Sequence, residues 1–175
     1  MELDRACTCC FSGHRPDKLP SGYRELPEAI APVKAALSAA IDEAITDGYN
    51  TFLCGIAQGV DLWAAEEILR RRKSETSLRL IAALPCPEQD ARWPYPQRER
   101  YRRLLAQIPA EARHVTCDSY TPYCMNGRNL WMVEHASRLI AVFDGSTGGT
   151  ANTVRRAEEH RLLIIKLHPL TGERW

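Results

Sequence analysis

The 175-residue sequence has no long apolar run and almost no net charge, and each absence excludes a class of protein. No apolar stretch approaches the roughly 20 residues that span a bilayer, so we expect no membrane association. Residues 1–5 include acidic side chains and no long apolar core, which argues against a secretory signal and predicts a cytoplasmic protein. The net charge of +1 provides no general attraction to nucleic acid or to anionic membranes.

Internal repeats, low-complexity tracts and linkers are also lacking, so we predict a single domain over residues 1–175. This length suffices for one domain with a proper core and is short for two. The hydrophobic content of 45% and the charged content of 26% are those of an ordinary globular protein.

The seven cysteines lack the even number and the spacing of a disulfide framework, and we expect free thiols in a reducing compartment. Cys7, Cys9 and Cys10, with His14 nearby, suggest zinc. However, no second Cys-x-x-Cys pair follows, and the cysteines fall in a predicted strand. We therefore predict no metal site and interpret these cysteines as small buried hydrophobic residues.

Continuous apolar runs alternate with amphipathic helical patterns along the whole chain. The predicted strands cover residues 6–12, 51–54, 78–84, 114–117, 139–143 and 162–167. The predicted helices cover residues 30–45, 62–73, 98–108, 129–135 and 151–160. This pattern predicts an α/β fold, a Rossmann-like parallel sheet of about six strands with helices on both faces.

A glycine-rich turn, residues 144–150 with the sequence Asp-Gly-Ser-Thr-Gly-Gly-Thr, separates the fifth predicted strand from a helix. Strand, glycine turn and helix together present backbone N–H groups and a helix N-terminus to an anion, usually a phosphate. Thr150 is predicted to cap that helix. An ordinary tight turn also uses glycines, so this stretch alone does not decide between the two interpretations.

A second glycine-bearing turn, residues 55–61, follows the second strand, and Asp61 is predicted to cap the next helix. Parallel sheets bind ligands beyond the C-terminal ends of their strands. We therefore expect Arg15 and Arg128 to pair with phosphate oxygens and Trp93 to stack on a base. The polar and glycine positions expected at this edge are Gly13, His14, Arg15, Gly55, Ala57, Gly59, Asp61, Gln89, Trp93, Arg128, Asn129, Asp144, Gly148, Gly149 and Thr150.

These two turns carry a resemblance to a known superfamily. Residues 55–61 are similar to the SG-x-A-x-G-[IV]-D motif of the DprA (Smf) proteins. Residues 144–153 resemble both the DprA Gly-Ser/Thr segment and the PGG-x-GT-x-x-E motif of LOG-type proteins. Together with residues 12–16 (Ser-Gly-His-Arg-Pro), residues 84–86, Arg128-Asn129 and Met132-Val133, they make the chain resemble the YpsA-like branch of the SLOG superfamily.

The resemblance implies a Rossmann-like fold that binds a nucleotide or a derivative, such as ADP-ribose, NAD or a nucleoside monophosphate, with no required cofactor. Relatives in the superfamily often self-associate, which implies a possible homo-oligomer. The ligand positions carried over from the motifs are Gly13, Arg15, Gly55, Ala57, Gly59, Asp61, Gly148, Gly149 and Thr150.

Catalysis depends on one position of the second motif. LOG-type enzymes hydrolyse the N-glycosidic bond of nucleoside monophosphates, and their motif has a glutamate where this chain has Thr153. Cleavage through an oxocarbenium-like transition state needs a carboxylate, for which the candidates are Asp61, Asp144 and Glu134. Nucleotide binding is therefore the leading interpretation, and an N-glycosidase of the phosphoribohydrolase kind is the alternative.

A second alternative is single-stranded DNA binding in the manner of the DprA proteins, which needs a basic groove with stacking aromatic residues. Residues 92–103 contain five arginines, interleaved with Trp93, Tyr95 and Tyr101. Glutamates lie beside these arginines on the predicted helix, so we interpret this segment as a solvated face. We expect a small-molecule nucleotide partner and not a nucleic acid.

Overall fold

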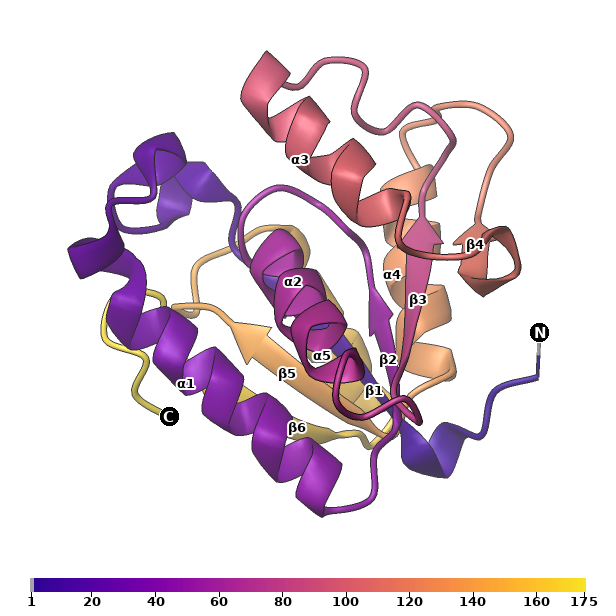
Figure 1. The fold of residues 1–175 in the computed structure, drawn as a ribbon, viewed down its shortest axis with the longest axis horizontal. Coiled ribbons are helices and arrows are strands. Elements are labelled where there is room, and N and C mark those ends of the chain that lie inside the picture. Colours follow the sequence, from indigo (N-terminus) through magenta and orange to yellow (C-terminus); the bar gives the residue numbers. More distant parts are fainter. Residues whose placement is uncertain (1) are drawn as a thin grey trace.

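Six strands form one parallel sheet in the computed structural model, which describes residues 2–175, and their order is β4-β3-β2-β1-β5-β6 (Figure 1). The strands are β1 (Thr8–Gly13), β2 (Thr51–Cys54), β3 (Arg79–Leu84), β4 (Arg113–Val115), β5 (Arg138–Val142) and β6 (Leu163–Leu167). The helices are α1 (Pro27–Thr46), α2 (Val60–Arg72), α3 (Tyr95–Leu105), α4 (Cys124–Glu134) and α5 (Gly149–Glu159). The predicted Rossmann-like α/β fold is confirmed.

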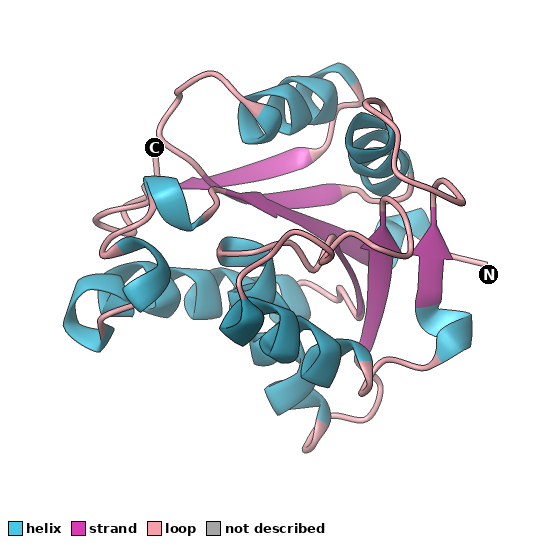
Figure 2. Ribbon diagram, turned by 90° about the horizontal axis from the view of Figure 1, so that it is seen from above, coloured by secondary structure: helices cyan, strands magenta, loops and turns pink. Residues whose placement is uncertain are grey.

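Helices cover both faces of the sheet (Figure 2). Successive side chains of a strand point to opposite faces, so Cys9 and Phe11 of β1 pack under α1, α2 and α3, whereas Cys10 packs with α4 and α5. This double coverage explains why the inner strands are mainly apolar and do not alternate with polar residues, whereas β4 at the edge of the sheet has no buried residue.

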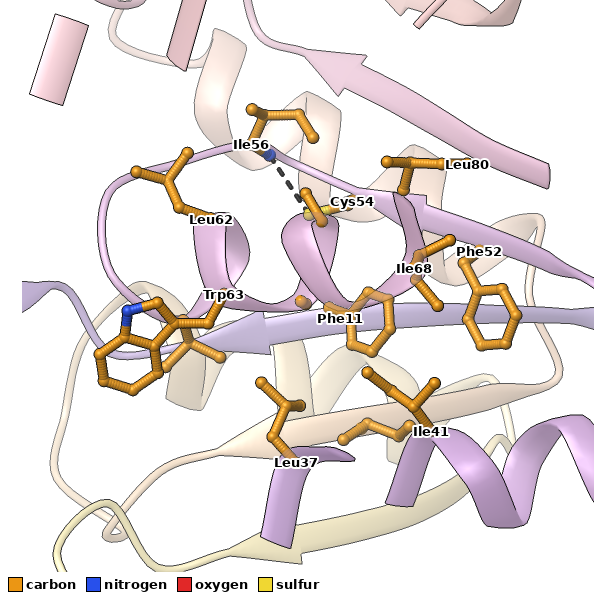
Figure 3. Packing of buried hydrophobic residues seen from close by; sticks show 14 of the residues in the cluster. Phe11, Leu37, Ile41, Phe52, Cys54, Ile56, Leu62, Trp63, Ile68 and Leu80 are labelled. Atoms are coloured by element: carbon orange, nitrogen blue, oxygen red, sulfur yellow. Dashed lines mark hydrogen bonds between the residues drawn. The ribbon is translucent and has the colours of Figure 1, made fainter. Parts of the chain in front are cut away.

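The larger core cluster lies under α1 and α2 (Figure 3). Phe11 and Phe52 stack with ring centroids 5.9 Å apart, and Leu37, Ile41 and Trp63 are fully buried beside them. Complete burial of such side chains contributes about 1.5–3 kcal/mol each, so this cluster supplies much of the stability of the fold.

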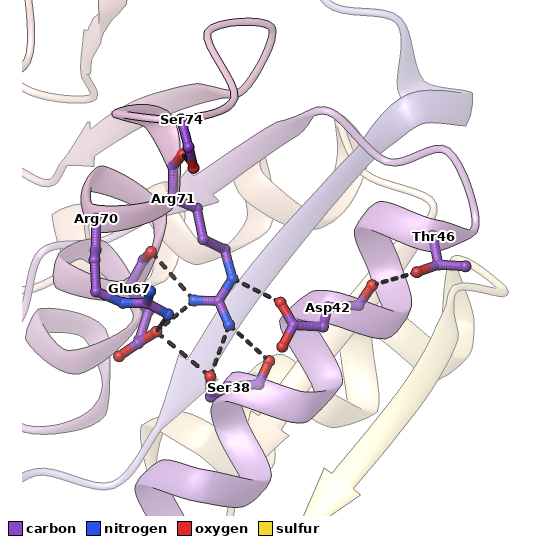
Figure 4. A network of polar contacts seen from close by, with 7 residues as sticks. All are labelled: Ser38, Asp42, Thr46, Glu67, Arg70, Arg71 and Ser74. Atoms are coloured by element: carbon purple, nitrogen blue, oxygen red, sulfur yellow. Dashed lines mark hydrogen bonds and ion pairs between the residues drawn. The ribbon is translucent and has the colours of Figure 1, made fainter.

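Helices α1 and α2 are also joined by a polar network centred on Arg71 (Figure 4). The Arg71 guanidinium donates to the Asp42 carboxylate at 2.8 Å and to the Ser38 hydroxyl at 2.7 Å on α1. It also pairs with Glu67, one turn earlier on α2. The basic C-terminal end of α2 therefore joins α2 to α1.

The chain adds β2, β3 and β4 on one side of β1 and then β5 and β6 on the other, so the strand order reverses between β1 and β5 and a crevice forms there. β1 pairs with β2 on one side and with β5 on the other, and Gly13 is in register with Val142. The helix after β1 covers one face of the sheet and the helix after β5 covers the other. A ligand crevice forms where two such helices diverge beyond the C-terminal ends of neighbouring strands.

All five helices begin two to five residues before their predicted starts, and the largest difference is at α4. α4 begins at Cys124, five residues before the predicted start at residue 129, so Arg128 lies inside a helix and not in the preceding turn. α3 begins at Tyr95 and not at residue 98, because a proline in the first turn of a helix loses no hydrogen bond.

The N-terminal cysteines face different directions. All seven cysteines are free thiols, and burial raises the pKa of Cys9 to about 12. Cys9 and Cys10 belong to the clusters on opposite faces of the sheet, so they do not converge on one metal ion. Within residues 2–175, no helix has the length and apolar character needed to cross a membrane.

Candidate functional site

A cleft of about 240 Å³ lies at the C-terminal ends of β1 and β5. The loop after β1 forms one wall, and the N-terminal turns of α4 and α5 form the other. Ten of the fifteen predicted ligand positions line it, namely Gly13, His14, Arg15, Ala57, Asp61, Arg128, Asn129, Gly148, Gly149 and Thr150. Residues from four separate segments of the chain are therefore brought together, as expected for motifs that follow the strands of a parallel sheet.

The N-terminus of α5 opens into this cleft without a side-chain cap. Its cap position is Gly148, which has a φ of +148°, a value that side chains rarely tolerate. The expected cap at Thr150 is wrong, because the helix already begins at Gly149. A Cβ atom placed on Gly149 would meet no described atom within 4 Å. The first N–H groups and the positive end of the helix dipole are therefore accessible to an anion.

The loop after β1 brings cationic groups to the glycine turn. Lys18 Nζ donates to Ser146 Oγ at 2.9 Å and to the Thr147 carbonyl at 3.2 Å. Arg15 is exposed and lines the same cleft. Arginine and lysine beside a free helix N-terminus are well suited to a phosphate group.

Arg128 and Asp61 form a buried ion pair in the wall of the cleft, with Nη1 and Oδ2 3.6 Å apart and side chains 6% and 7% exposed. Burial raises the pKa of Asp61, although the charge of Arg128 opposes this shift. Burial likewise lowers the pKa of Arg128. Arg128 Nε and Nη1 have no hydrogen-bond partner among residues 2–175. An arginine so deeply buried with unused donors is costly unless another acceptor binds there.

The turn at residues 55–61 is filled by the protein itself. A Cβ atom on Gly55 would lie 1.1 Å from Arg128 Nη1, and one on Gly59 would lie 2.5 Å from the His14 carbonyl. Asp61 does not cap α2 as predicted, because it follows the helix start at Val60. Its Oδ2 instead accepts the N–H of Ala57 at 3.3 Å. This turn therefore holds Asp61 and Arg128 in place, while Gly55 and Gly59 stay outside the cleft lining.

His14 and Asp144 connect the two strands at the crevice. His14 is 4% exposed, and its Nε2 lies 2.8 Å from Asp144 Oδ1, which also accepts the Ser146 N–H at 2.9 Å. These contacts, of which those with Ser146 are the largest, hold the pKa of the Asp144 carboxyl well below its usual range. Asp144 does not line the cleft; its carboxylate orients His14 and shapes the glycine turn.

Three further predicted positions lie elsewhere. Trp93 packs edge-on against Tyr101, with centroids 5.3 Å apart, in the α3 side of the core, so it does not reach a base in this cleft. The Gln89 amide donates to the Gly55 carbonyl at 3.3 Å. Glu134 is exposed at the last residue of α4, just before β5 begins, and therefore lies at the opposite edge of the sheet.

Thr153, at the position of the LOG-type glutamate, is fully buried. Its hydroxyl donates to the Gly149 carbonyl at 3.0 Å, one turn back along α5. Within the described chain, no group of three or more His, Cys, Asp and Glu side chains is arranged to hold a metal ion. The carboxylates that line the cleft are Asp17 and Asp61.

The predicted ligand positions leave out nine residues that line the cleft, among them Lys18, Met125 and Asn126. Lys18 follows the predicted turn residues at 13–15 closely enough for the same loop to have suggested it. Met125 and Asn126 were not predicted because the sequence of residues 120–127 is typical of a turn. In the structure they belong to the first turn of α4, which begins at Cys124.

Comparison with known proteins gives the family. A family model described as the YspA SLOG family matches residues 9–163. The uncharacterized SPbeta prophage-derived protein YoqJ of Bacillus subtilis is 31% identical over an alignment of 150 positions that covers 78% of this chain and 88% of YoqJ. The UPF0398 protein YpsA of the same organism is 23% identical over 151 residues, which are 86% of this chain and 83% of YpsA.

Two solved structures share the fold. DNA processing protein A (DprA) of Helicobacter pylori, whose structure was described for its single-stranded DNA binding mode, superposes with a TM-score of 0.61 and 17% identity, covering 98% of this chain and 70% of DprA. DprA of Streptococcus pneumoniae gives 0.57 and 14%, covering 93% of this chain, which spans only 50% of that DprA chain. With the family model matching almost from end to end, the chain belongs to the YspA SLOG family.

Proposed function

We propose that this protein binds a nucleotide or a nucleotide derivative, with a phosphate group at the N-terminus of α5. The walls of the cleft carry three cations, Arg15, Lys18 and Arg128, against the carboxylates Asp17 and Asp61. The open space at Gly149 allows a ligand oxygen to approach the backbone closely.

The observation that carries this proposal is that Arg128 is buried in the wall of the cleft with unused hydrogen-bond donors. Its side chain is 6% exposed, lines the cleft, and lies 3.6 Å from its carboxylate partner, beyond hydrogen-bond distance. A surface arginine satisfies its donors with water, but this one lies at the bottom of a cleft that faces a free helix N-terminus. An anionic ligand with several oxygens supplies acceptors to both sites at once.

A thermal-shift panel of AMP, ADP-ribose and NAD tests the proposal. At a ligand concentration 100 times Kd, binding raises the Tm of a domain of this size by roughly 5–10 °C. The Gly149→Asp variant places a carboxylate at the phosphate position and should lose the shift. Ala39→Asp, at an exposed position on α1 on the other face of the sheet, adds the same charge and should keep it. The absence of a shift with all three ligands contradicts the proposal.

N-glycosidic hydrolysis is a second candidate, and Asp61 is the observation that favours it. Asp61 lines the cleft and its pKa is raised by burial, as in carboxyl groups that donate a proton to a leaving group. Release of free base from AMP or NAD, followed by chromatography, measures the activity. We expect Asp61→Asn to abolish release while the melting curve still shows a folded protein. Release equal to that of heat-inactivated protein eliminates this candidate.

Single-stranded DNA binding is the candidate that the DprA fold suggests. Three of the five arginines of residues 92–103 are paired with carboxylates. Arg100 bonds Glu66 at 2.6 Å and Glu25 at 2.8 Å, and Asp90 lies 3.0 Å from Arg102 and 3.9 Å from Arg98. Paired arginines release few counterions on binding DNA. We therefore expect weak binding in a mobility-shift assay even at low salt, and a tight, steeply salt-dependent complex would contradict this expectation.

A further inference from the structure

The His14 imidazole lies in the wall of the cleft, whereas its partner Asp144 lies outside the cleft lining. His14 Nε2 is 2.8 Å from Asp144 Oδ1, and the imidazole packs edge-on against the Phe143 ring, with centroids 6.2 Å apart. These contacts fix the imidazole between the end of β1 and the glycine turn. The binding of a phosphate at α5 does not by itself use this pair of titratable side chains.

The Asp144 carboxylate decides which ring nitrogen of His14 carries the hydrogen. Contacts with Ser146 above all hold the pKa of this carboxyl well below its usual range, so the carboxyl is ionised at neutral pH. An ionised carboxylate only accepts hydrogen bonds, so His14 Nε2 is the donor of the contact. In the neutral imidazole the basic lone pair then lies on Nδ1.

His14 Nδ1 is not used by the protein. It has no hydrogen-bond partner among residues 2–175, and it does not belong to the fully enclosed polar atoms that lack a partner. Polar atoms of a side chain that is only 4% exposed are normally hydrogen-bonded within the protein, so this open nitrogen is unusual. Because His14 lines the cleft, Nδ1 is available to a water molecule there.

The surroundings of this base favour chemistry at phosphorus. Arg15 follows His14 directly in the cleft wall, and Lys18 Nζ donates to Ser146 Oγ at 2.9 Å in the same glycine turn as Asp144. Two cations and the open N-terminus of α5 stabilise the negative charge on the oxygens of a phosphoryl group under attack. Histidine is the side chain that most often takes the proton of an attacking water.

We propose that this site hydrolyses the phosphoryl group of its bound nucleotide, with His14 as the general base and Asp144 as the residue that positions it. His14 Nδ1 takes a proton from water, the water oxygen forms a bond to phosphorus, and the bond from phosphorus to the leaving oxygen breaks. The leaving oxygen gains a proton from solvent and the imidazolium loses one to solvent. The products are inorganic phosphate and the remaining nucleotide or nucleoside.

This activity rests on the proposed function, because the phosphate must lie at the α5 N-terminus. It differs from N-glycosidic cleavage in the bond that breaks. Cleavage with Asp61 as the acid releases free base and leaves the phosphate on the ribose. Hydrolysis with His14 as the base releases inorganic phosphate and leaves the base on the ribose.

Phosphate release from AMP and ADP in isotopically labelled water tests the proposal, and we expect the label in inorganic phosphate. His14→Gln keeps an amide N–H for Asp144 but has no basic nitrogen, so it should lower kcat by about 100-fold. Its binding of the hydrolysis-resistant α,β-methylene analogue of ADP should stay within about twofold of native binding by calorimetry. His160→Gln, at an exposed histidine that follows α5, is the matched control and should release phosphate at the native rate.

Two further variants separate catalysis from a structural role. Free imidazole should restore phosphate release to His14→Ala, because it supplies the missing base, and a loss due only to altered structure would not respond. Asp144→Asn should lower kcat by at least about tenfold, because the imidazole is no longer held in its donor tautomer. Its binding of the ADP analogue should stay within about twofold of native binding.

The failures of the two proposals are distinguishable. If AMP, ADP and the ADP analogue all fail to bind, the proposed function is wrong and the hydrolysis with it. If the analogue binds but no phosphate is released, if the label is absent from the phosphate, or if His14→Gln is as fast as the native protein, the hydrolysis is wrong while binding stands. Release of free base without phosphate also overturns it and favours N-glycosidic cleavage.

Discussion

The two glycine-bearing turns of this protein are similar in sequence, but the space beside the glycines is occupied in one turn and open in the other. In the turn at residues 55–61, the space beside Gly55 is occupied by Arg128 and the space beside Gly59 by the His14 carbonyl. In the turn at residues 144–150, the space beside Gly149 is open, and the nearest atom to a Cβ on Gly148 is Lys18 Nζ at 4.0 Å.

A glycine in a tight turn removes a side chain so that another group can come close. In the earlier turn that group is part of the protein, and the glycines are needed for folding. In the later turn the space is open, and under the proposed function the glycines there are needed for binding. The two turns should therefore respond to substitution in different experiments, one in stability and the other in affinity.

The largest effect is expected when the group that fills the earlier turn is removed. Arg128→Leu leaves the Asp61 carboxylate buried without its charge partner, and loss of one member of a buried pair costs about 3 kcal/mol of unfolding free energy. Without Arg128 the Asp61 pKa rises further, so the destabilisation should shrink as the pH falls and the carboxyl becomes neutral in the folded state. Urea unfolding at two pH values measures this change, and a loss independent of pH contradicts it.

Adding a methyl group to the earlier turn should have the next largest effect. In Gly55→Ala the new Cβ atom collides with the Arg128 guanidinium, and overpacking of this kind costs about 2 kcal/mol. The urea midpoint should fall with an unchanged m value. A variant as stable as the native protein would show that Arg128 is free to leave the turn.

The same change in the later turn should leave stability intact. In Gly149→Ala the new Cβ atom enters open space at the first position of α5, so the unfolding free energy should stay constant or rise by up to about 1 kcal/mol. Binding of ADP should weaken by about tenfold, because the backbone is then partly covered. Calorimetry and urea unfolding on the same sample separate the two effects.

The smallest effect concerns pH and the Asp144 carboxylate. Its pKa in the folded state is below the unfolded value of about 4, so its contacts stabilise the protein above that pH and are lost as the pH falls through the folded value. Asp144→Asn should therefore reduce the decrease in Tm below about pH 4. The difference in Tm between this variant and the native protein should be small, because the Asp144 side chain is 35% exposed. Asp118→Asn, at another exposed carboxylate, removes the same charge and is the matched control.

Much of the fold could be predicted because its signals are local. Runs such as residues 139–143 are apolar throughout, and strands of this kind occur where helices cover both faces of a sheet. The cleft followed from the same reasoning, since Gly13, Asp61 and Gly149 each come just after a strand or open the next helix.

The remaining features depend on contacts between distant residues. Trp93 was expected to face a base, but Tyr101, two turns along α3, offers it a buried partner. Glu134 was considered from its residue type, and only the position of α4 relative to β5 excludes it from the cleft. The inward direction of Arg128 was likewise hidden, because the start of α4 at Cys124 carries no clear sequence signal.

The contact between His14 and Asp144 joins residues 130 positions apart in the chain. The cleft therefore does not exist until β5 has paired with β1, when most of the chain is in place. Bringing two such distant residues together costs chain entropy. A ligand that binds only the folded protein, in which β1 and β5 are paired, therefore stabilises the whole sheet. Bound nucleotide should thus slow hydrogen exchange in strands far from the cleft, so that occupancy of the site can be read from the protection of the entire protein.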